Sequence, residues 1–332
     1  MSNKPPIEVP QGAIRLNTDS QKLEFFAQDR WYEFATNTPT LDGGGRGLVA
    51  GGNNPDQTNT MQFVTISTAG NSTDFGDLTA KTQSNPSATG NSTRGLIGGG
   101  QVFPALTNKI DLITFSTTSN ATDFGDLTVA RRNLIGNGNQ TRGIFAGGQT
   151  PTNQDVIDFV TISQTGNAVD FGNLTSARKQ LGGTASSPTR SLFFGGQTPS
   201  DVDVIDFITI PTTGNAQDFG DLLTVNFIPS GVSSSTRAVI MGGGSPSTVN
   251  TIQFITITTL GNAQNFGDLT EAVRNSQSAS DCVRGVRMGG GNGNTNVIDY
   301  IKIATAGDAV DFGDLATPQG EGAGCSNAHG GL

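Results

Sequence analysis

Five residues, Asp74-Phe75-Gly76-Asp77-Leu78, return in nearly the same form along most of the chain, and this repeat constrains the fold more than any other feature. Successive copies of the phenylalanine are 49, 47, 48, 47 and 46 residues apart. Such a regular period indicates structural units stacked in sequence rather than one irregular core. The six phenylalanines are Phe75, Phe124, Phe171, Phe219, Phe266 and Phe312.

Each repeat can be divided into four expected strands. An arginine opens an apolar strand that ends in paired glycines, as in residues 142–148, and an alternating strand follows, as in 156–162. A turn, the Asp-Phe-Gly strand and a small-residue strand then lead to the next arginine. The glycine-ended strand is apolar at successive positions, as in 192–194, so both its faces should be covered. Four-stranded blades stacked around an axis provide that cover, with each phenylalanine in the wedge between two blades. The sequence therefore predicts an all-β fold with a six-bladed β-propeller at residues 46–332.

The repeat is out of phase with the ends of the chain. The first unit begins at an arginine strand, residues 46–52, whereas residues 322–330 resemble the small-residue strand that normally precedes an arginine. We therefore expect residues 320–329 to pair beside residues 46–52 and to close the ring, with Cys325, His329 and Arg46 at the closure. His329 falls at the position of the recurrent arginine. The recurrent arginines are Arg46, Arg94, Arg142, Arg190, Arg237 and Arg284.

Residues 1–40 follow a different pattern. Alternating or apolar segments at 12–17, 23–26 and 31–34 are separated by turns, which predicts a three-stranded β-meander. Residues 41–45 form a Gly-rich linker. A meander this small is not stable alone, so it should pack on the propeller or on another chain. The side chains expected to dock it are Ile14, Leu16, Phe25, Phe26, Trp31 and Tyr32.

The charge balance excludes several kinds of partner. A formal charge of −9 and a pI near 4.5 argue against binding to nucleic acid or to an anionic membrane. No apolar run is long enough to span a bilayer, and the first residues lack the apolar region of a signal peptide. We expect a protein that is made and kept in a cytoplasm. The two cysteines, Cys282 and Cys325, are expected to be free thiols rather than a bridge.

The order of arginine, apolar strand, Gly-Gly, Ile-Asp-Phe and Leu-Thr-x-Ala-Arg resembles the kelch repeat of β-propellers. Residues 126–131 and 173–178 match its blade end, although Phe stands where kelch proteins usually have Trp. The segments Thr-Gly-Asn-Ala-x-Asp-Phe-Gly-Asp-Leu-Thr, Thr-Arg-Gly and Gly-Gly-Gly are similar to the kelch-type repeats of virion structural proteins in tailed phages of marine cyanobacteria. The leader at 12–31 is similar to short β-meanders that begin phage fibre and tail proteins.

This resemblance implies a virion structural protein that is assembled in the host cytoplasm. It would be a multimeric tail or fibre component, docked on other virion proteins through residues 1–40, with the propeller displayed for adhesion or decoration. Binding of a host-surface glycan is a hypothesis based on polar loop composition. The alternatives are capsid decoration or assembly without receptor binding, a glycan-active propeller enzyme, and a cellular kelch scaffold.

Several residues could carry chemistry, and each also has a structural interpretation. The paired aspartates, such as Asp74 and Asp77, could bind calcium or act as acid and base, but their presence in every repeat favours a role in turns. The arginines could bind an anion, yet bonding to a neighbouring backbone group or carboxylate is favoured. With one histidine, His329, no catalytic set can be assembled, and no cofactor or metal is expected.

The segments after the Gly-Gly pairs differ among the repeats, whereas the turns before Asp-Phe-Gly are almost identical. Loops that diverge on a repeated scaffold are the better candidates for a partner surface. The loop residues expected to contact a partner or glycan are Asn53, Asn54, Gln101, Gln149, Gln197, Asn292 and Asn294.

Overall fold

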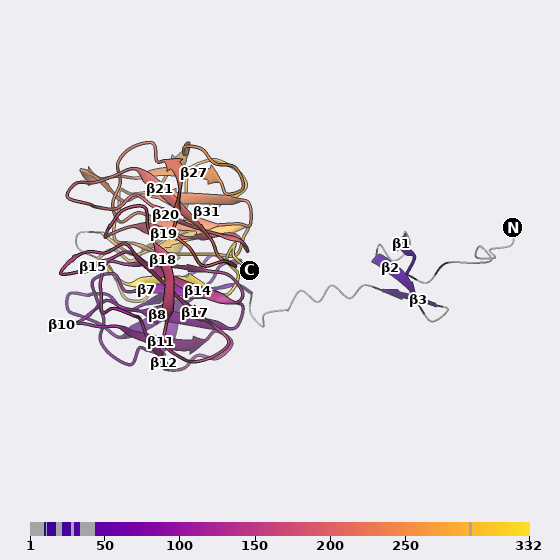
Figure 1. The fold of residues 1–332 in the computed structure, drawn as a ribbon, viewed down its shortest axis with the longest axis horizontal. Helices are drawn as coiled ribbons and strands as arrows, with labels where there is room; N and C mark the ends of the chain where they lie inside the picture. Colours follow the sequence, from indigo (N-terminus) through magenta and orange to yellow (C-terminus); the bar gives the residue numbers. More distant parts are fainter. Residues whose placement is uncertain (1–9, 11, 18–21, 28–29, 34–43, 292–293) are drawn as a thin grey trace, which may run out of the picture. The chain divides into compact units, whose positions relative to one another are not determined.

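The computed structural model describes residues 10, 12–17, 22–27, 30–33, 44–291 and 294–332. It divides the chain into two units, Met1–Leu41 and Asp42–Leu332. The described residues form strands, bridges and turns without a helix (Figure 1), so the predicted all-β class is confirmed. The expected Gly-rich linker at 41–45 lies mostly outside the described residues, which resume at Gly44.

The N-terminal unit contains the predicted three-stranded meander. Strands β1 (Ile14–Asn17), β2 (Lys22–Ala27) and β3 (Arg30–Glu33) pair in the antiparallel order β1-β2-β3. The register places Phe25 opposite Tyr32 and Phe26 opposite Trp31. Both cross-strand pairs are aromatic, and such pairs stabilise a small sheet.

The described residues of the second unit form four four-stranded antiparallel sheets and one eight-stranded sheet. We count the two four-stranded halves of the latter separately and number the resulting six sheets 1 to 6 along the chain. In each, the first strand in the order below is the small-residue strand, and the fourth carries the Asp-Phe-Gly motif. Sheet 1 contains β33 (Ala323–Ser326), β4 (Arg46–Ala50), β5 (Thr60–Thr65) and β6 (Thr73–Asp77). Sheet 2 contains β7 (Ser87–Gly90), β8 (Arg94–Gly98), β11 (Lys109–Thr114) and β12 (Thr122–Asp126). Sheet 3 contains β13 (Ile135–Gly138), β14 (Arg142–Ala146), β17 (Val156–Thr161) and β18 (Val169–Asn173).

The remaining three sheets repeat this arrangement. Sheet 4 contains β19 (Gly182–Ser186), β20 (Arg190–Phe194), β21 (Val204–Thr209) and β22 (Gln217–Asp221). Sheet 5 contains β23 (Ser230–Ser233), β24 (Arg237–Met241), β27 (Thr251–Thr256) and β28 (Gln264–Asp268). Sheet 6 contains β29 (Gln277–Ser280), β30 (Arg284–Met288), β31 (Val297–Lys302) and β32 (Val310–Asp314). One parallel bridge, Gly183 to Ser230, joins sheets 4 and 5 into a continuous eight-stranded sheet.

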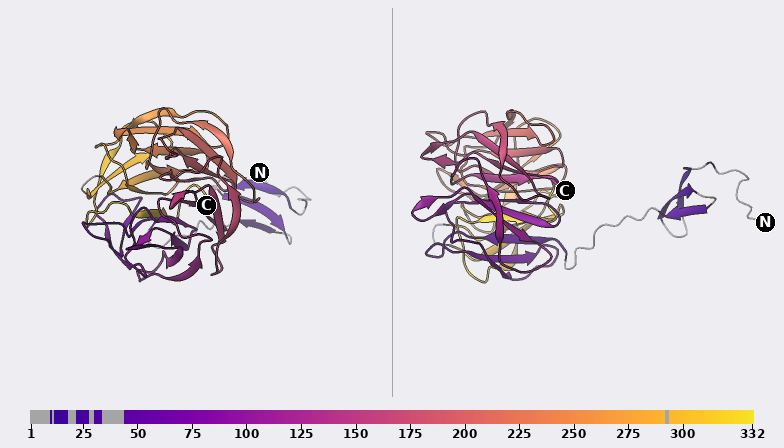
Figure 2. Two further views of the ribbon diagram at one scale, coloured as in Figure 1. Left: turned by 60° about the vertical axis from the view of Figure 1, so that its left-hand side comes forward. Right: turned by 60° about the horizontal axis from the view of Figure 1, so that its bottom comes forward.

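The C-terminal strand completes the first sheet. Strand β33 pairs with β4, and the register runs from Ala323 opposite Ala50 to Ser326 opposite Gly47. This pairing was predicted from the phase of the repeat. In Figure 2 the yellow strands at the end of the chain accordingly lie beside the indigo strands of sheet 1.

The hydrophobic core consists of six clusters, and each spans two neighbouring sheets. One cluster contains Leu48 and Phe75 of sheet 1 with Ile97 and Ile113 of sheet 2. The series ends with a cluster that joins Val286 of sheet 6 to sheet 1. The small-residue strands are also in contact in the cyclic order β33, β7, β13, β19, β23, β29 and again β33. The second unit is therefore held together between sheets rather than around one central core.

The repeated motif has a different task at each residue. Its phenylalanines are 1–3% exposed and pack in these inter-sheet clusters, which agrees with the predicted wedge. Burial of one such side chain contributes about 1.5–3 kcal/mol. The glycine of the motif lies under the next sheet, because a Cβ on Gly125 would be 2.4 Å from the carbonyl oxygen of Gly166. Only a residue without a side chain fits there.

Candidate functional site

The two ends of the sheets differ. At one end, which we call the arginine end, each second strand begins at a recurrent arginine. At the other, which we call the loop end, lie the connections from second to third strand and the links from sheet to sheet. This assignment follows from the antiparallel strand order, and the loops and links also pair directly, as Gln101 with Gln83 and Gln197 with Lys179.

At the arginine end, every recurrent arginine reaches the next sheet. Arg142 Nη1 donates to the carbonyl oxygen of Ile210 at 2.7 Å, and Arg190 Nη1 donates to that of Ile257 at 2.8 Å. The series closes with Arg284, which donates to Ser67 of sheet 1 at 2.9 Å. The arginines are therefore bonded to neighbouring backbone, as predicted. The remaining pairs are Arg46 with Phe115, Arg94 with Ile162, and Arg237 with Ile303 and Ala304.

The turn before each Asp-Phe-Gly strand also holds two sheets together. Asn167 Oδ1 accepts a hydrogen bond from the backbone amide of Asp126 in the preceding sheet at 3.1 Å. The backbone amides of Gly166 and Ala168 donate to Phe124 and Asp126 along the same strand. These bonds cover the outer edge strand, which would otherwise expose unpaired backbone groups. The near-identity of these turns therefore has a structural cause.

The loop end begins at the paired glycines, whose φ angles are positive, for example +63° at Gly147 and +106° at Gly148. Beyond them the connections differ in form. Among the described residues, three carry a short two-stranded hairpin that the repeat pattern did not predict, in addition to the four expected strands of each unit. These hairpins are β9 (Gln101–Val102) with β10 (Ala105–Leu106), β15 (Gln149–Thr150) with β16 (Thr152–Asn153), and β25 (Gly244–Ser245) with β26 (Ser247–Thr248).

The predicted loop residues lie at this end, and several of their amides bind neighbouring loops. Asn294 Nδ2 donates to the carbonyl oxygen of Asn53 at 2.9 Å, which links sheet 6 to sheet 1. Gln101 Oε1 accepts from Arg132 at 3.2 Å. Gln197 Nε2, by contrast, donates to Asp201 of its own loop at 2.7 Å. The predicted residues are thus half-buried members of a laterally bonded polar surface.

The other predicted loop residues bind partners in their own loops or lie outside the residues that the structure describes. Gln149 Nε2 donates to the carbonyl oxygen of Pro151 at 3.0 Å. The backbone amide of Asn54, a half-buried residue, donates to the carbonyl oxygen of Asp56 at 2.8 Å. Asn292 lies outside the described residues.

One loop residue was missed from the sequence. Phe103, at the tip of the β9–β10 hairpin, is 73% exposed, more than any other large hydrophobic residue among those described. Its backbone amide donates to Gln57 Oε1 of the neighbouring loop at 3.2 Å. The sequence carried no clear signal, since Phe103 lies among other apolar residues, in the run Val102-Phe103-Pro104-Ala105-Leu106. An exposed ring beside amide groups is a suitable contact for a partner molecule.

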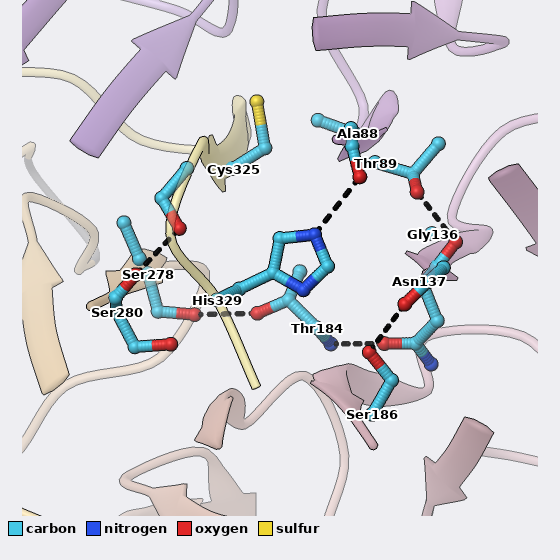
Figure 3. Close-up of a pocket in the computed structure, with 14 residues that line it drawn as sticks. Ala88, Thr89, Gly136, Asn137, Thr184, Ser186, Ser278, Ser280, Cys325 and His329 are labelled. Carbon is cyan, nitrogen blue, oxygen red and sulfur yellow. Dashed lines mark hydrogen bonds between the residues drawn. The ribbon is translucent and has the colours of Figure 1, made fainter. Parts of the chain in front are cut away.

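A small cavity of about 20 Å³ lies among the small-residue strands (Figure 3). Its lining includes Ala88, Asn137, Thr184, Cys325 and His329, which come from four different sheets and from the tail after β33. Figure 3 shows the imidazole directed inward between these strands. The cavity has room for about one water molecule.

His329 does not occupy the position predicted for it. Strand β33 ends at Ser326, and His329 lies beyond it in the tail. Asn327, rather than His329, replaces the usual turn residue, because its Oδ1 accepts from the backbone amide of Arg46 at 2.8 Å. His329 Nε2 is 2.9 Å from the carbonyl oxygen of Gly90, and Nδ1 accepts from the amide of Gly331 at 3.1 Å. Cys325, opposite Leu48, and Arg46 do lie at the closure.

The charges in this cavity are suppressed by burial. Burial lowers the pKa of His329 from its ordinary value, although the hydrogen bond to Gly90 acts in the opposite direction. Burial raises the pKa of the Cys325 thiol to about 12. Both groups are therefore neutral near pH 7, and Cys325 is not a thiolate nucleophile. Cys282 and Cys325 are both free.

In the described part of the chain, no group of three or more His, Cys, Asp or Glu side chains is arranged to hold a metal ion. The same residues contain no helix with the length and apolar character needed to cross a membrane.

In the N-terminal unit, the predicted docking side chains form ring contacts. Phe25 and Tyr32 are stacked with centroids 5.5 Å apart, and Phe26 meets Trp31 edge to face at 5.3 Å. The Arg15 guanidinium lies 4.1 Å from the Trp31 ring centroid. Ile14 is 62% exposed. The side chain of Leu16 lies outside the description, although its backbone belongs to β1.

Comparison with models of known protein families and with characterised proteins finds no match for this chain.

Proposed function

We propose that residues 46–332 form a six-bladed kelch-like β-propeller whose blades are sheets 1 to 6. Three observations support this: the cyclic contacts of the small-residue strands, the six clusters between neighbouring sheets, and the pairing of β33 with β4. An electron-microscopy map of the purified protein tests it. A view along the axis with six equivalent wedges is expected, whereas an open half-barrel built on the eight-stranded sheet would contradict it.

We further propose that the protein is a virion structural component in which this body is displayed for adhesion or decoration. The observation that carries the proposal is that the arginine end and the loop end lie at opposite ends of the sheets. The chain enters sheet 1 at the arginine end, where Gly45 packs near Ala328, while the diverging loops lie at the loop end. A segment anchored to another virion protein through residues 1–40 would leave the loop end available to a target.

The ligand proposed for the loop end is a glycan of the host surface. Amide and hydroxyl groups dominate its loops, and such groups bond to sugar hydroxyls without requiring charge. The exposed ring of Phe103 adds an apolar face. Carbohydrate recognition commonly combines these two kinds of contact, a polar set that orients and an apolar surface that is desolvated.

The full-length protein can be tested on an array of host-surface glycans and on host cells. Binding is expected, and Phe103→Ser should weaken it by about tenfold if the ring contributes roughly 1.4 kcal/mol. Val169→Ser is the matched control, because Val169 is also an exposed apolar residue, at 58%, but lies on the outer strand β18. Absence of binding to glycans and cells would exclude adhesion and leave capsid decoration or assembly.

A further inference from the structure

Each sheet places one polar side chain at the same buried position of its third strand. In sheets 3 and 4 it is Asp158 and Asp206, and both are 0% exposed. The links that precede these two sheets carry the Leu-Thr-x-Ala-Arg segment, which delivers a threonine and an arginine to this position. The six equivalent residues are Gln62, Asp111, Asp158, Asp206, Gln253 and Asp299.

In sheets 3 and 4 the arginine neutralises the carboxylate. Arg131 Nη1 is 2.8 Å from Asp158 Oδ2, and Arg178 Nη2 is 2.5 Å from Asp206 Oδ2. The guanidinium groups also donate to backbone carbonyl oxygens, as Arg178 does to Gly195 at 2.8 Å. A buried carboxylate without such a partner would be costly.

Three other sheets lack this arginine and compensate in another way. In sheet 1 the pair is neutral, since Gln62 Nε2 donates to Gln319 Oε1 at 2.8 Å. In sheet 5 the carboxylate is again replaced, by Gln253, which accepts from the amide of Leu223 at 2.8 Å. In sheet 6 Asp299 is kept, and Arg287 of the adjacent strand supplies the guanidinium.

Sheet 2 alone keeps the carboxylate and lacks the cation. Asp111 is 7% exposed, and Thr82 stands where Arg131 and Arg178 stand in their sheets. Thr79 donates to Asp111 through its amide at 2.9 Å and its hydroxyl at 2.6 Å, as the equivalent threonines do elsewhere. No ion pair to Asp111 occurs in the described structure, although Lys109 begins the same strand.

A pocket that is open to solvent lies beside this carboxylate. Asp111, Thr82, Ile97 and Gly99 contribute to its lining. Ile97 and Gly99 are equivalent to Phe145 and Gly195, whose carbonyl oxygens bind the guanidinium groups of sheets 3 and 4. The cavity therefore offers a carboxylate and a backbone surface of the kind that binds an arginine head group elsewhere in this chain.

The state of Asp111 agrees with a missing counter-ion. Burial raises the pKa of Asp111 above its ordinary value of 3.8, against the lowering effects of the Thr79 hydrogen bonds and of the Lys109 charge. The nearby Asp123 raises the same pKa further.

We propose that the cavity beside Asp111 is a binding site for a guanidinium group, supplied either by a small free cation or by an arginine side chain of a partner. The carboxylate pairs with the planar cation. The cavity lining contacts the cation as the equivalent residues of sheets 3 and 4 contact the guanidinium groups of Arg131 and Arg178. The site lies at the loop end, at the base of the β9–β10 hairpin, since Val102 and Thr107 also line it. An arginine that entered there would approach past the exposed Phe103.

The test measures the melting temperature of the full-length protein with and without guanidinium chloride at about 10 mM. At this concentration the denaturing effect is small because it grows linearly with concentration. Relative to the same concentration of sodium chloride, we expect the melting temperature to rise by about 1–2 °C. A ligand present at roughly ten times its dissociation constant gives a shift of this size. Asp111→Asn should remove the rise.

Thr82→Arg provides the matched variant, because it supplies the guanidinium covalently and should make the added cation ineffective. Arg178→Thr should create a second site in sheet 4 and gain an extra rise; if that variant does not fold, Thr82→Arg still decides. An equal rise in wild type, Asp111→Asn and Thr82→Arg, or no rise in wild type, would overturn the proposal.

The source of the guanidinium is distinguished by the same measurement with N-acetyl-arginine amide and, for comparison, N-acetyl-lysine amide. A rise with the arginine derivative alone supports a partner's side chain as the occupant. A rise with guanidinium but not with the arginine derivative supports a free cation. Neither result depends on glycan binding.

Discussion

The arginine end and the loop end are built on the same six sheets, yet they use their side chains differently. At the arginine end, each arginine donates to the backbone of the next sheet, and the bonds return from sheet 6 to sheet 1. At the loop end, neighbouring loops are joined by contacts that change from sheet to sheet, such as Asn294 with Asn53 and Arg132 with Gln101.

This difference separates assembly from recognition. Loss of a contact that is present in every sheet weakens the interface between two neighbouring sheets. Repetition of a contact therefore indicates a role in holding the sheets together. A contact made once is under no such requirement. The loop end can therefore vary without loss of the fold, and recognition of a partner is best placed there.

The largest effect is expected for Gly125→Ala, which tests the repeated outer edge. The new Cβ would approach the carbonyl oxygen of Gly166 to 2.4 Å, at a φ of +149°. We expect a loss of about 3 kcal/mol in the free energy of unfolding, measured by urea denaturation. Gly166→Ala is the control, since its φ is +158° with no atom within 4 Å, and it should cost about 1 kcal/mol. Equal losses would show that the close approach between sheets is unimportant.

The next effect compares two arginines at opposite ends. Arg142→Met removes a bond to Ile210 of the next sheet and a guanidinium 4.7 Å from the Phe159 ring centroid, so it should cost about 2 kcal/mol. Arg132→Met at the loop end removes a bond to a side chain, that of Gln101, and should cost under about 1 kcal/mol. Both losses in the free energy of unfolding are measured by urea denaturation. A larger loss for Arg132→Met than for Arg142→Met would contradict the assignment of assembly to the arginine end and recognition to the loop end.

Sequence reasoning was most accurate where residues repeat. The six copies of the motif, five with Asp-Phe-Gly and one with Asn265-Phe266-Gly267, predicted the strand order, the buried phenylalanines and the pairing of β33, because a requirement that recurs six times is visible without a structure. The meander was predicted for the same kind of reason, since its apolar and polar residues alternate along short strands.

The errors fall where a residue occurs once. The position of His329 was misassigned because its place in the tail depends on the cavity among the sheets, which no local pattern specifies. The exposure of Phe103 and the missing counter-ion of Asp111 likewise became visible only when equivalent positions of different sheets were compared in three dimensions. For Thr82 the sequence did contain the signal, since the Leu-Thr-x-Ala-Arg segment is incomplete there.

The smallest effect concerns the single histidine. Because the folded state keeps His329 neutral with a lowered pKa, the unfolded chain binds a proton more readily below the ordinary value of 6.5. The stability contributed by the neutral ring should be fully present above pH 6.5 and should be lost as the pH falls from there through the lowered value. Cys325 lines the same cavity but keeps its proton throughout this range.

His329→Gln should therefore flatten the fall in stability that begins below pH 6.5, because an amide can still donate to Gly90 but does not titrate. Urea denaturation of both proteins at closely spaced pH values measures the difference between the two curves. The acidic side chains titrate alike in both, so their contribution cancels. Parallel curves would show that the imidazole is protonated without cost in the folded protein, and the contact between tail and sheet 2 would then lie open to water rather than sealed among the six sheets.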